Sequence, residues 1–157
     1  MKTRKTLLVG LALTTMVAAW TQSSAAGADS TTIVVIVNRA NPAAVLEAGE
    51  LRPIFQTSKT SWGRGGEATP LNLPNESKLR QEFDRAVLGL DPDRAARYWQ
   101  DRKIRGGARA PKQLPTSGAV LAAVAATPGA VGYVYAGEAN KAVKVVAKIV
   151  GGKLSAP

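Results

Sequence analysis

The sequence contains no histidine and no cysteine in its 157 residues. Without these residues there is no imidazole base, no thiolate nucleophile and no zinc site of the usual ligand types. The lack of cysteine also excludes disulfides, so stability in an oxidising compartment has to come from packing alone. The two absences together remove most familiar catalytic and metal-binding arrangements.

Acidic residues are also few, with eleven aspartates and glutamates against twenty-one lysines and arginines. The carboxylates that could form an acid–base pair are Glu76, Glu82, Asp84, Asp91 and Asp93. Asp91 and Asp93 are better explained as the cap and the acidic first turn of a helix. Glu82 and Asp84 are better explained as part of a solvated helix face. We therefore expect no enzymatic activity and no cofactor.

The formal net charge is +10, and the cations are scattered from Arg39 to Lys153 apart from three near the N-terminus. Their densest group lies in residues 94–112. A basic chain of this size can accompany nucleic acid, anionic ligands or an anionic cell envelope. No recognised DNA-binding or RNA-binding pattern is present, so we expect a solvated basic face and no nucleic-acid partner.

Residues 1–28 have the three-part pattern of a secretory signal peptide. A positive start at residues 2–5 precedes an uncharged apolar run at 7–20, and small residues then offer a cleavage site after Ala26 or Ala28. The alternative is an N-terminal membrane anchor, but an anchor needs about 20 apolar residues and this run is shorter. The pattern predicts a cleaved signal peptide and a periplasmic or secreted protein.

Residues 29–157 have the length of one ordinary domain. The β-branched run at 31–42 predicts a strand buried on both faces, which is typical of a parallel sheet. The other expected elements are helices over 43–55, 79–90, 91–105 and 118–127 (the last capped by Ser117), and strands over 68–74, 130–137 and 141–150, the last near a sheet edge. This order predicts an α/β domain with a mostly parallel sheet flanked by helices.

The strand at 68–74 leads directly into the helix that follows, and such junctions often hold anions. Asn75 and Ser77 can cap this helix, several N–H groups of residues 76–79 would be unpaired, and Lys78 adds a positive charge. Glu76 opposes an anion, because its carboxylate satisfies the helix dipole itself. The alternative is a capped helix with only water at its end.

Two glycine-rich stretches, at 63–66 and 105–109, invite comparison with phosphate-binding loops. Neither has the Gly-Lys-Ser/Thr of a Walker motif or the spacing of a dinucleotide fingerprint, and plain turns explain both. Arg105, Gly106 and Gly107 remain candidates to line a site. Trp62, Trp99 and Tyr133 are expected in the core or at its rim.

Three segments carry a family resemblance: ELRPIF…SW over 50–62, PLNLPNESKLRQEF over 70–83 and ATPGAVGYV over 126–134. Together they resemble the phosphate-type periplasmic substrate-binding proteins of ABC transporters, and most closely the short, stand-alone members of that superfamily. The resemblance runs from Ile33 to about Tyr135. It implies one lobe of a periplasmic-binding-protein-like fold, a small oxyanion ligand such as phosphate, and a membrane transporter as partner.

In the phosphate-binding members, an Arg-x-Asp-Gly-Ser-Gly-Thr type segment leads into the helix that holds the oxyanion. That segment falls on 72–78 here, with Asn72 in the place of the arginine and Glu76 in the place of the first serine. The resemblance and the helix start together give the candidate ligand-binding residues Asn72, Asn75, Glu76, Ser77, Lys78, Arg105, Gly106 and Gly107. The alternative function is an envelope protein-interaction or sensory accessory module that binds no ligand.

Overall fold

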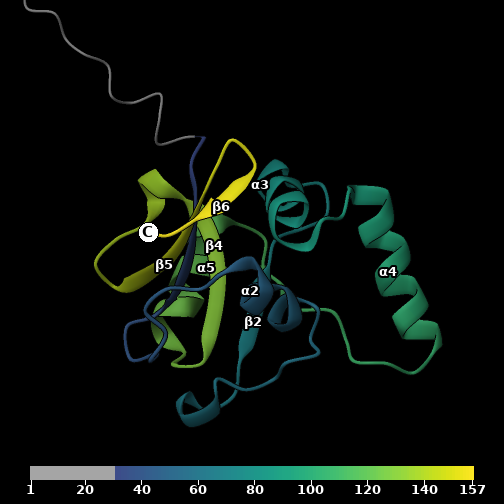
Figure 1. Ribbon diagram of the computed structural model, residues 1–157, viewed down its shortest axis with the longest axis horizontal. Coiled ribbons are helices and arrows are strands. Elements are labelled where there is room, and N and C mark those ends of the chain that lie inside the picture. The colour runs from purple at the N-terminus through teal and green to yellow at the C-terminus, as the bar shows by residue number, and fades with distance from the viewer. Residues whose placement is uncertain (1–30) are drawn as a thin grey trace, which may run out of the picture.

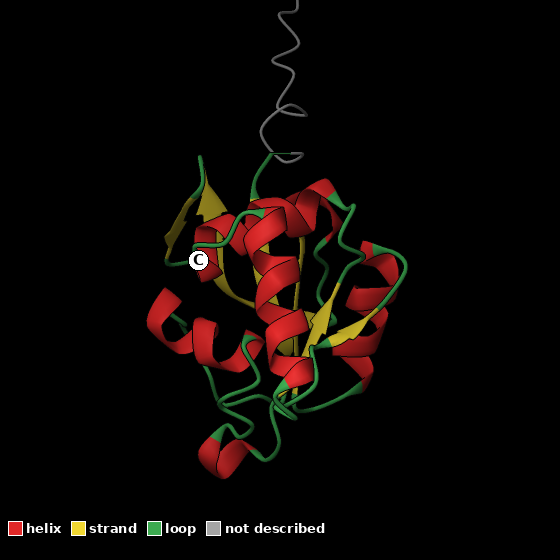
Figure 2. Ribbon diagram, turned by 90° about the vertical axis from the view of Figure 1, so that its right-hand side faces the viewer, coloured by secondary structure: helices red, strands yellow, loops and turns green. Residues whose placement is uncertain are grey.

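The computed structural model describes residues 31–157 (Figure 1). The predicted signal peptide at 1–28 lies outside the described residues. The described part folds as one sheet with helices on both of its faces (Figures 1 and 2). No helix in this part is long and apolar enough to span a bilayer.

The sheet has six strands in the order β3-β2-β4-β1-β5-β6. Their bounds are β1 Ile33–Asn38, β2 Thr69–Asn72, β3 Lys112–Gln113, β4 Ala130–Tyr135, β5 Val143–Val150 and β6 Lys153–Ser155. β1 lies inside the sheet with all six residues buried, as its continuous apolar run predicts. The α/β fold with flanking helices is confirmed, and β5 lies next to the edge strand β6.

Parallel pairing is found at one end of the sheet. β2 pairs in parallel with both β3 and β4, whereas β1 pairs antiparallel with β4 and β5, and β5 pairs antiparallel with β6. The sheet is therefore mixed, and the mostly parallel arrangement that the sequence predicts holds only at one end. The continuous apolar run of β1 is typical of a parallel strand, but both of its neighbours are antiparallel. The parallel end of the sheet is the one that leads into the candidate site. β3 and β6 fall in segments for which the sequence predicted no strand.

The helices are α2 Ala48–Phe55, α3 Lys78–Phe83, α4 Pro92–Ile104 and α5 Ser117–Ala126. α3 continues without a break into a π-helical turn, η2 Asp84–Leu88, which ends at Gly89 in the left-handed conformation. Short 3-10 turns lie at η1 Gly63–Gly65 and η3 Ala136–Glu138.

The two faces of β4 show which helices cover which side of the sheet. Tyr133 stacks on Phe83 of α3 with ring centroids 3.9 Å apart, and Phe83 contacts Phe55 of α2 at 4.6 Å. Gly132 is the neighbouring residue, so a β-carbon there would point to the opposite side, where it would meet the side chain of Val120 in α5. α2 and α3 therefore cover one face, and α5 covers the other.

The expected cap of α5 is wrong by one residue. Thr116, not Ser117, is the N-cap, because the Thr116 hydroxyl accepts from the N–H of Ala119 at 3.1 Å. The helix is buried on one side: Val120 and Val124 are buried, and the alanines of the outer face are exposed or half-buried. Small side chains let an apolar helix cover the sheet from the surface.

α4 stands apart from these layers. It lies at the right edge of the fold in Figure 1 and faces the viewer in Figure 2. Of its thirteen residues only Ala95 is buried, and none of them belongs to the main hydrophobic core.

Candidate functional site

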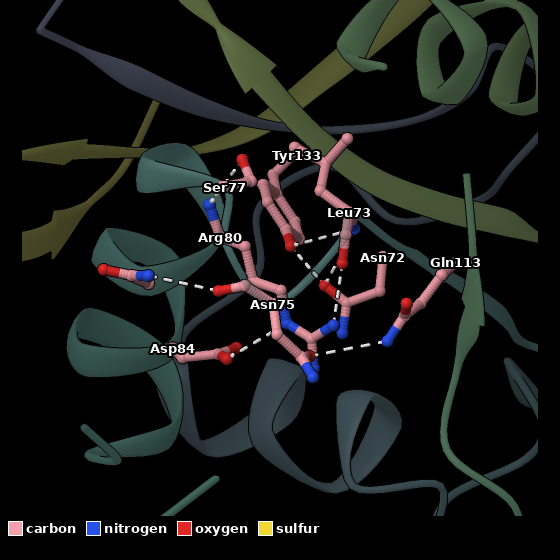
Figure 3. Close-up of polar contacts among 9 residues, drawn as sticks. Asn72, Leu73, Asn75, Ser77, Arg80, Asp84, Gln113 and Tyr133 are labelled. Atoms are coloured by element: carbon pink, nitrogen blue, oxygen red, sulfur yellow. Dashed lines mark hydrogen bonds and ion pairs between the residues drawn. The ribbon is translucent and has the colours of Figure 1, made fainter. Parts of the chain in front are cut away.

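The candidate site lies where β2 passes through a short loop into α3 (Figure 3). Ser77 is the N-cap, since its hydroxyl accepts from the N–H of Arg80 at 3.4 Å. The N–H groups of Lys78 and Leu79, at the first two helical positions, have no hydrogen-bond partner within residues 31–157. The predicted cap at Ser77 is confirmed, and the junction presents open donors as a helix start should.

Asn75 was the other predicted cap of this helix, but its side chain does not cap it. Its side-chain oxygen accepts from the Gln113 amide of β3 at 3.5 Å, and its carbonyl accepts from the Gln81 amide at 3.1 Å. The residue is exposed, as is Glu76 beside it. Asn75 therefore connects the loop to β3 and to α3 instead of closing the helix end.

Asn72 lies below the surface and is 2 % exposed. Its side-chain oxygen accepts from the Tyr133 hydroxyl and from the N–H of Leu73, the latter at 3.2 Å (Figure 3). The residue that takes the place of the family's arginine is thus engaged inside the protein.

Arg80 is a buried cation beneath the same loop, with 3 % of its surface exposed. Its Nη1 donates to the carbonyl of Leu73 at 2.7 Å, and its Nε lies 3.3 Å from Oδ2 of Asp84 (Figure 3). The expectation that Asp84 lies on a solvated helix face is therefore wrong, since Asp84 is 4 % exposed. Both residues of the pair lie off the apolar stripe of the helix, so the stripe does not indicate their burial. The signal that could have found the pair is the four-residue spacing of opposite charges.

The charges of this buried network balance one another. Burial raises the pKa of Asp84, while the neighbouring Arg80 guanidinium lowers it, and burial is the larger effect. Burial and the charge of Asp84 also raise the pKa of Tyr133 well above its usual range, so its hydroxyl stays protonated and donates to Asn72. Oδ1 of Asp84 has no hydrogen-bond partner in the described residues. Arg80 consequently offers little net charge to a ligand.

A hollow of about 490 Å³ runs beside α3, and we refer to it as the α3 hollow. Its charged lining comes from one face of the helix: Lys78, Glu82 and Arg85. Its apolar lining comes from the strands: Ile33 of β1, Tyr135 of β4 and Ile149 of β5. With two cations and one carboxylate, this lining has a net positive charge.

Arg105, Gly106 and Gly107 lie elsewhere, at the C-terminal end of α4. Arg105 is exposed and 3.6 Å from Asp101, while the two glycines line a different hollow of the surface. The structure therefore does not bring these three residues together with Lys78 in one cavity.

The exposed groups at the start of α3 define what the site can do. The open N–H groups of Lys78 and Leu79, the Lys78 ammonium and the helix dipole all favour an anion. The Glu76 carboxylate opposes it. Within residues 31–157 no group of three or more carboxylates could hold a metal ion.

No protein-family model matches this chain, and no curated protein does. Solved structures do match. An ABC-type phosphate transport receptor from Vibrio cholerae aligns with a TM-score of 0.58 and 19% identity, over 75% of this chain and 47% of that one. A Clostridium perfringens protein, described as a phosphate ABC transporter substrate-binding protein and solved with bound phosphate, aligns at 0.59 and 17%, over 75% and 46%.

PstS from Borrelia burgdorferi aligns with a TM-score of 0.57 and 14% identity, over 73% of this chain and 46% of that one. This chain thus spans less than half the length of each of these proteins. At such identities the likeness establishes the fold, which is that of one domain of the periplasmic-binding-protein type. It confirms the fold that the sequence resemblance implies.

Proposed function

We propose that this protein is an exported solute-binding component, without enzymatic activity, that captures a small oxyanion at the start of α3. Phosphate is the foremost candidate, and the membrane part of an ABC transporter is the matching partner class. The observation that carries the proposal is the position of residues 72–78: this strand-to-helix junction presents two open N–H groups in a fold shared with phosphate-binding proteins.

The geometry favours weak binding. Asn72 and Arg80 are engaged internally, so the donors left for a ligand are two N–H groups, the Ser77 hydroxyl and Lys78. Asn75, Glu76 and Lys78 are exposed, so the described domain leaves the start of α3 open on one side. We expect a dissociation constant of about 0.1 to 1 mM, equivalent to about −5.5 to −4 kcal/mol.

Calorimetric titration with phosphate at low ionic strength tests this site, with sulfate as the competing anion. Ser77→Asp keeps a capping side chain but adds a carboxylate, so it should abolish binding. Glu76→Gln removes the opposing charge and should tighten binding by about threefold to tenfold. Lys59→Gln changes an exposed cation in another loop and is the matched control, which should leave the affinity unchanged.

A second candidate function is an envelope protein-interaction or sensory module built on the same fold. The engagement of Asn72 with Tyr133 favours it, because the family's arginine position no longer faces a ligand. The absence of any heat at millimolar phosphate, with the folded state verified by circular dichroism, would reject the oxyanion site and favour this second function.

A further inference from the structure

α4 carries an aromatic cluster that no core explains. Tyr98 and Trp99 pack edge to face with ring centroids 4.9 Å apart, and both are only half-buried. Neither ring belongs to the main hydrophobic core or to the residues packed against it. Ile104, at the end of the helix, is 75 % exposed. This much apolar surface on one projecting helix is typical of a contact surface.

The two rings are held in place by a cation. Arg102 donates to the Tyr98 hydroxyl at 2.8 Å, and its guanidinium lies 5.7 Å from the Tyr98 ring centroid and 5.9 Å from that of Trp99. Both distances are within the range of a cation–π interaction. The cluster is therefore fixed before any partner arrives, which lowers the entropic cost of binding.

The segment after α4 folds back and makes the wall of a hollow of about 570 Å³, the α4 hollow, with Trp99 on its other side. Gly106 has φ +69°, and its N–H donates to the backbone carbonyl of Lys103 at 3.2 Å. The N–H of Gly107 donates to the carbonyl of Arg102 at 2.8 Å, and a side chain at Gly107 would come within 3.1 Å of that carbonyl oxygen. The wall is thus a built helix cap that needs glycine.

The charge around the α4 hollow has one sign. Lys103 and Arg109 line it, and no acidic side chain is among the described residues that do so. The Asp101 carboxylate, two residues before Lys103 in the sequence, is paired with Arg105 at 3.6 Å. An occupant that carries negative charge is favoured, and a second copy of this basic helix is disfavoured.

We propose that the α4 hollow is a docking site for an acidic segment of a partner protein, which inserts one apolar side chain against Trp99. Carboxylates on either side of that side chain pair with Lys103 and Arg109. A concave hollow suits an inserted side chain, whereas a flat lipid surface would require the aromatic rings to project outward. The inference does not rest on the proposed oxyanion site, which lies on α3.

The test uses a short synthetic peptide in which one leucine stands between two runs of glutamate. Heteronuclear NMR shifts of the purified protein report its binding in the native protein and in every variant. We expect saturable binding in the micromolar range that weakens at least about tenfold in Trp99→Ala. The double variant Lys103→Glu, Arg109→Glu should lose at least as much.

Two matched controls separate specific docking from attraction between net charges. Lys59→Glu with Arg64→Glu changes the net charge equally on a distant exposed loop and should alter the affinity less than about twofold. A peptide with glycine in place of leucine should bind at least about tenfold more weakly.

Three outcomes would overturn the proposal. The first is that both pairs of charge reversals weaken peptide binding equally. The second is that the leucine and glycine peptides bind equally well. The third is that phosphatidylglycerol vesicles bind the protein through Trp99 while the peptide shows no saturable binding. The last outcome would assign the surface to a membrane.

Discussion

Arg80 and Asp84 form a buried ion pair, with side chains 3% and 6% exposed. The two other ion pairs in residues 31–157 are largely exposed. Because Arg80 also donates to the carbonyl of Leu73, the pair ties the loop before α3 to the turn that follows it. At the residue scale, this pair positions the candidate site without belonging to its exposed surface.

Asp84→Asn should destabilise the protein markedly. The substitution preserves the shape of the side chain but leaves the Arg80 guanidinium buried without a counter-charge. Removal of one partner from a buried pair costs about 3–5 kcal/mol, and we expect a loss near the lower end because asparagine can still accept a hydrogen bond. Urea denaturation followed by circular dichroism measures the change in the free energy of unfolding.

Asp101→Asn is the comparison for this experiment. It breaks the pair with Arg105, whose side chains are 79% and 68% exposed, and should cost less than about 1 kcal/mol. Equal losses in the two variants would mean that water reaches the Arg80 guanidinium and that the pair does not organise the loop.

The candidate site could be predicted from the sequence only in part. Ser77 was recognisable as a cap because a serine between a strand and an apolar stripe is a local signal. Burial of Asn72 was not predictable in this way, since it depends on Tyr133, which is remote along the chain. The partners of Arg80 are Leu73 and Asp84, which are near in sequence, and only the four-residue spacing to Asp84 indicates that pair. A polar residue can be buried when neighbours in the fold supply its hydrogen-bond partners, and the periodicity of the sequence does not identify those neighbours.

At the scale of elements, the packing of α5 on β4 depends on one glycine. A β-carbon at Gly132 would lie 2.5 Å from Cγ1 of Val120 and 3.3 Å from Cγ2 of Val124. These two valines are the buried residues of α5. The missing side chain therefore sets how closely the helix approaches the sheet.

Gly132→Ala should force α5 away from β4 and lower the free energy of unfolding by about 1–3 kcal/mol, as overpacked core substitutions do. Gly118→Ala places the same methyl group within α5. Its nearest neighbour there would be the Thr116 hydroxyl oxygen, 3.9 Å away. This control should be neutral or stabilise by up to about 1 kcal/mol. Thermal and urea unfolding of both variants would show the difference, and a neutral Gly132→Ala would disprove the close packing.

The long elements were predictable, and the short ones were not. β1 and β4 carry continuous apolar runs, so their existence follows from composition alone. An apolar run does not specify the direction of its neighbour, so the pattern did not predict that parallel pairing is found only in the β3–β2–β4 part of the sheet. β3 consists of two exposed residues, and only their parallel pairing with β2 defines them as a strand.

At the scale of the whole molecule, positive charge is spread over the surface. The cations occupy loops, helices and strands from Arg39 to Lys153, and only the region of α4 concentrates them. A scattered distribution attracts polyanions without recognising their structure.

The protein should therefore elute at the same salt concentration from immobilised double-stranded DNA and from a simple sulfonate exchanger of matched charge density. Counterion release alone governs both interactions. Salt-gradient chromatography of the purified protein on both matrices measures this, with a basic DNA-binding protein as a reference for selective retention. Clearly later elution from DNA would restore nucleic acid as a partner.

The position of β1 has a consequence for how the chain acquires its structure. Ile33 pairs with Tyr135 on one side and with Ile149 on the other, so β1 waits for two strands that are synthesised much later. Such remote pairing slows folding, because a long loop must close before any contact stabilises it. Until β4 and β5 have been synthesised, β1 has no neighbour in the sheet, so a nascent chain that ends before Ala130 cannot yet form the centre of the domain.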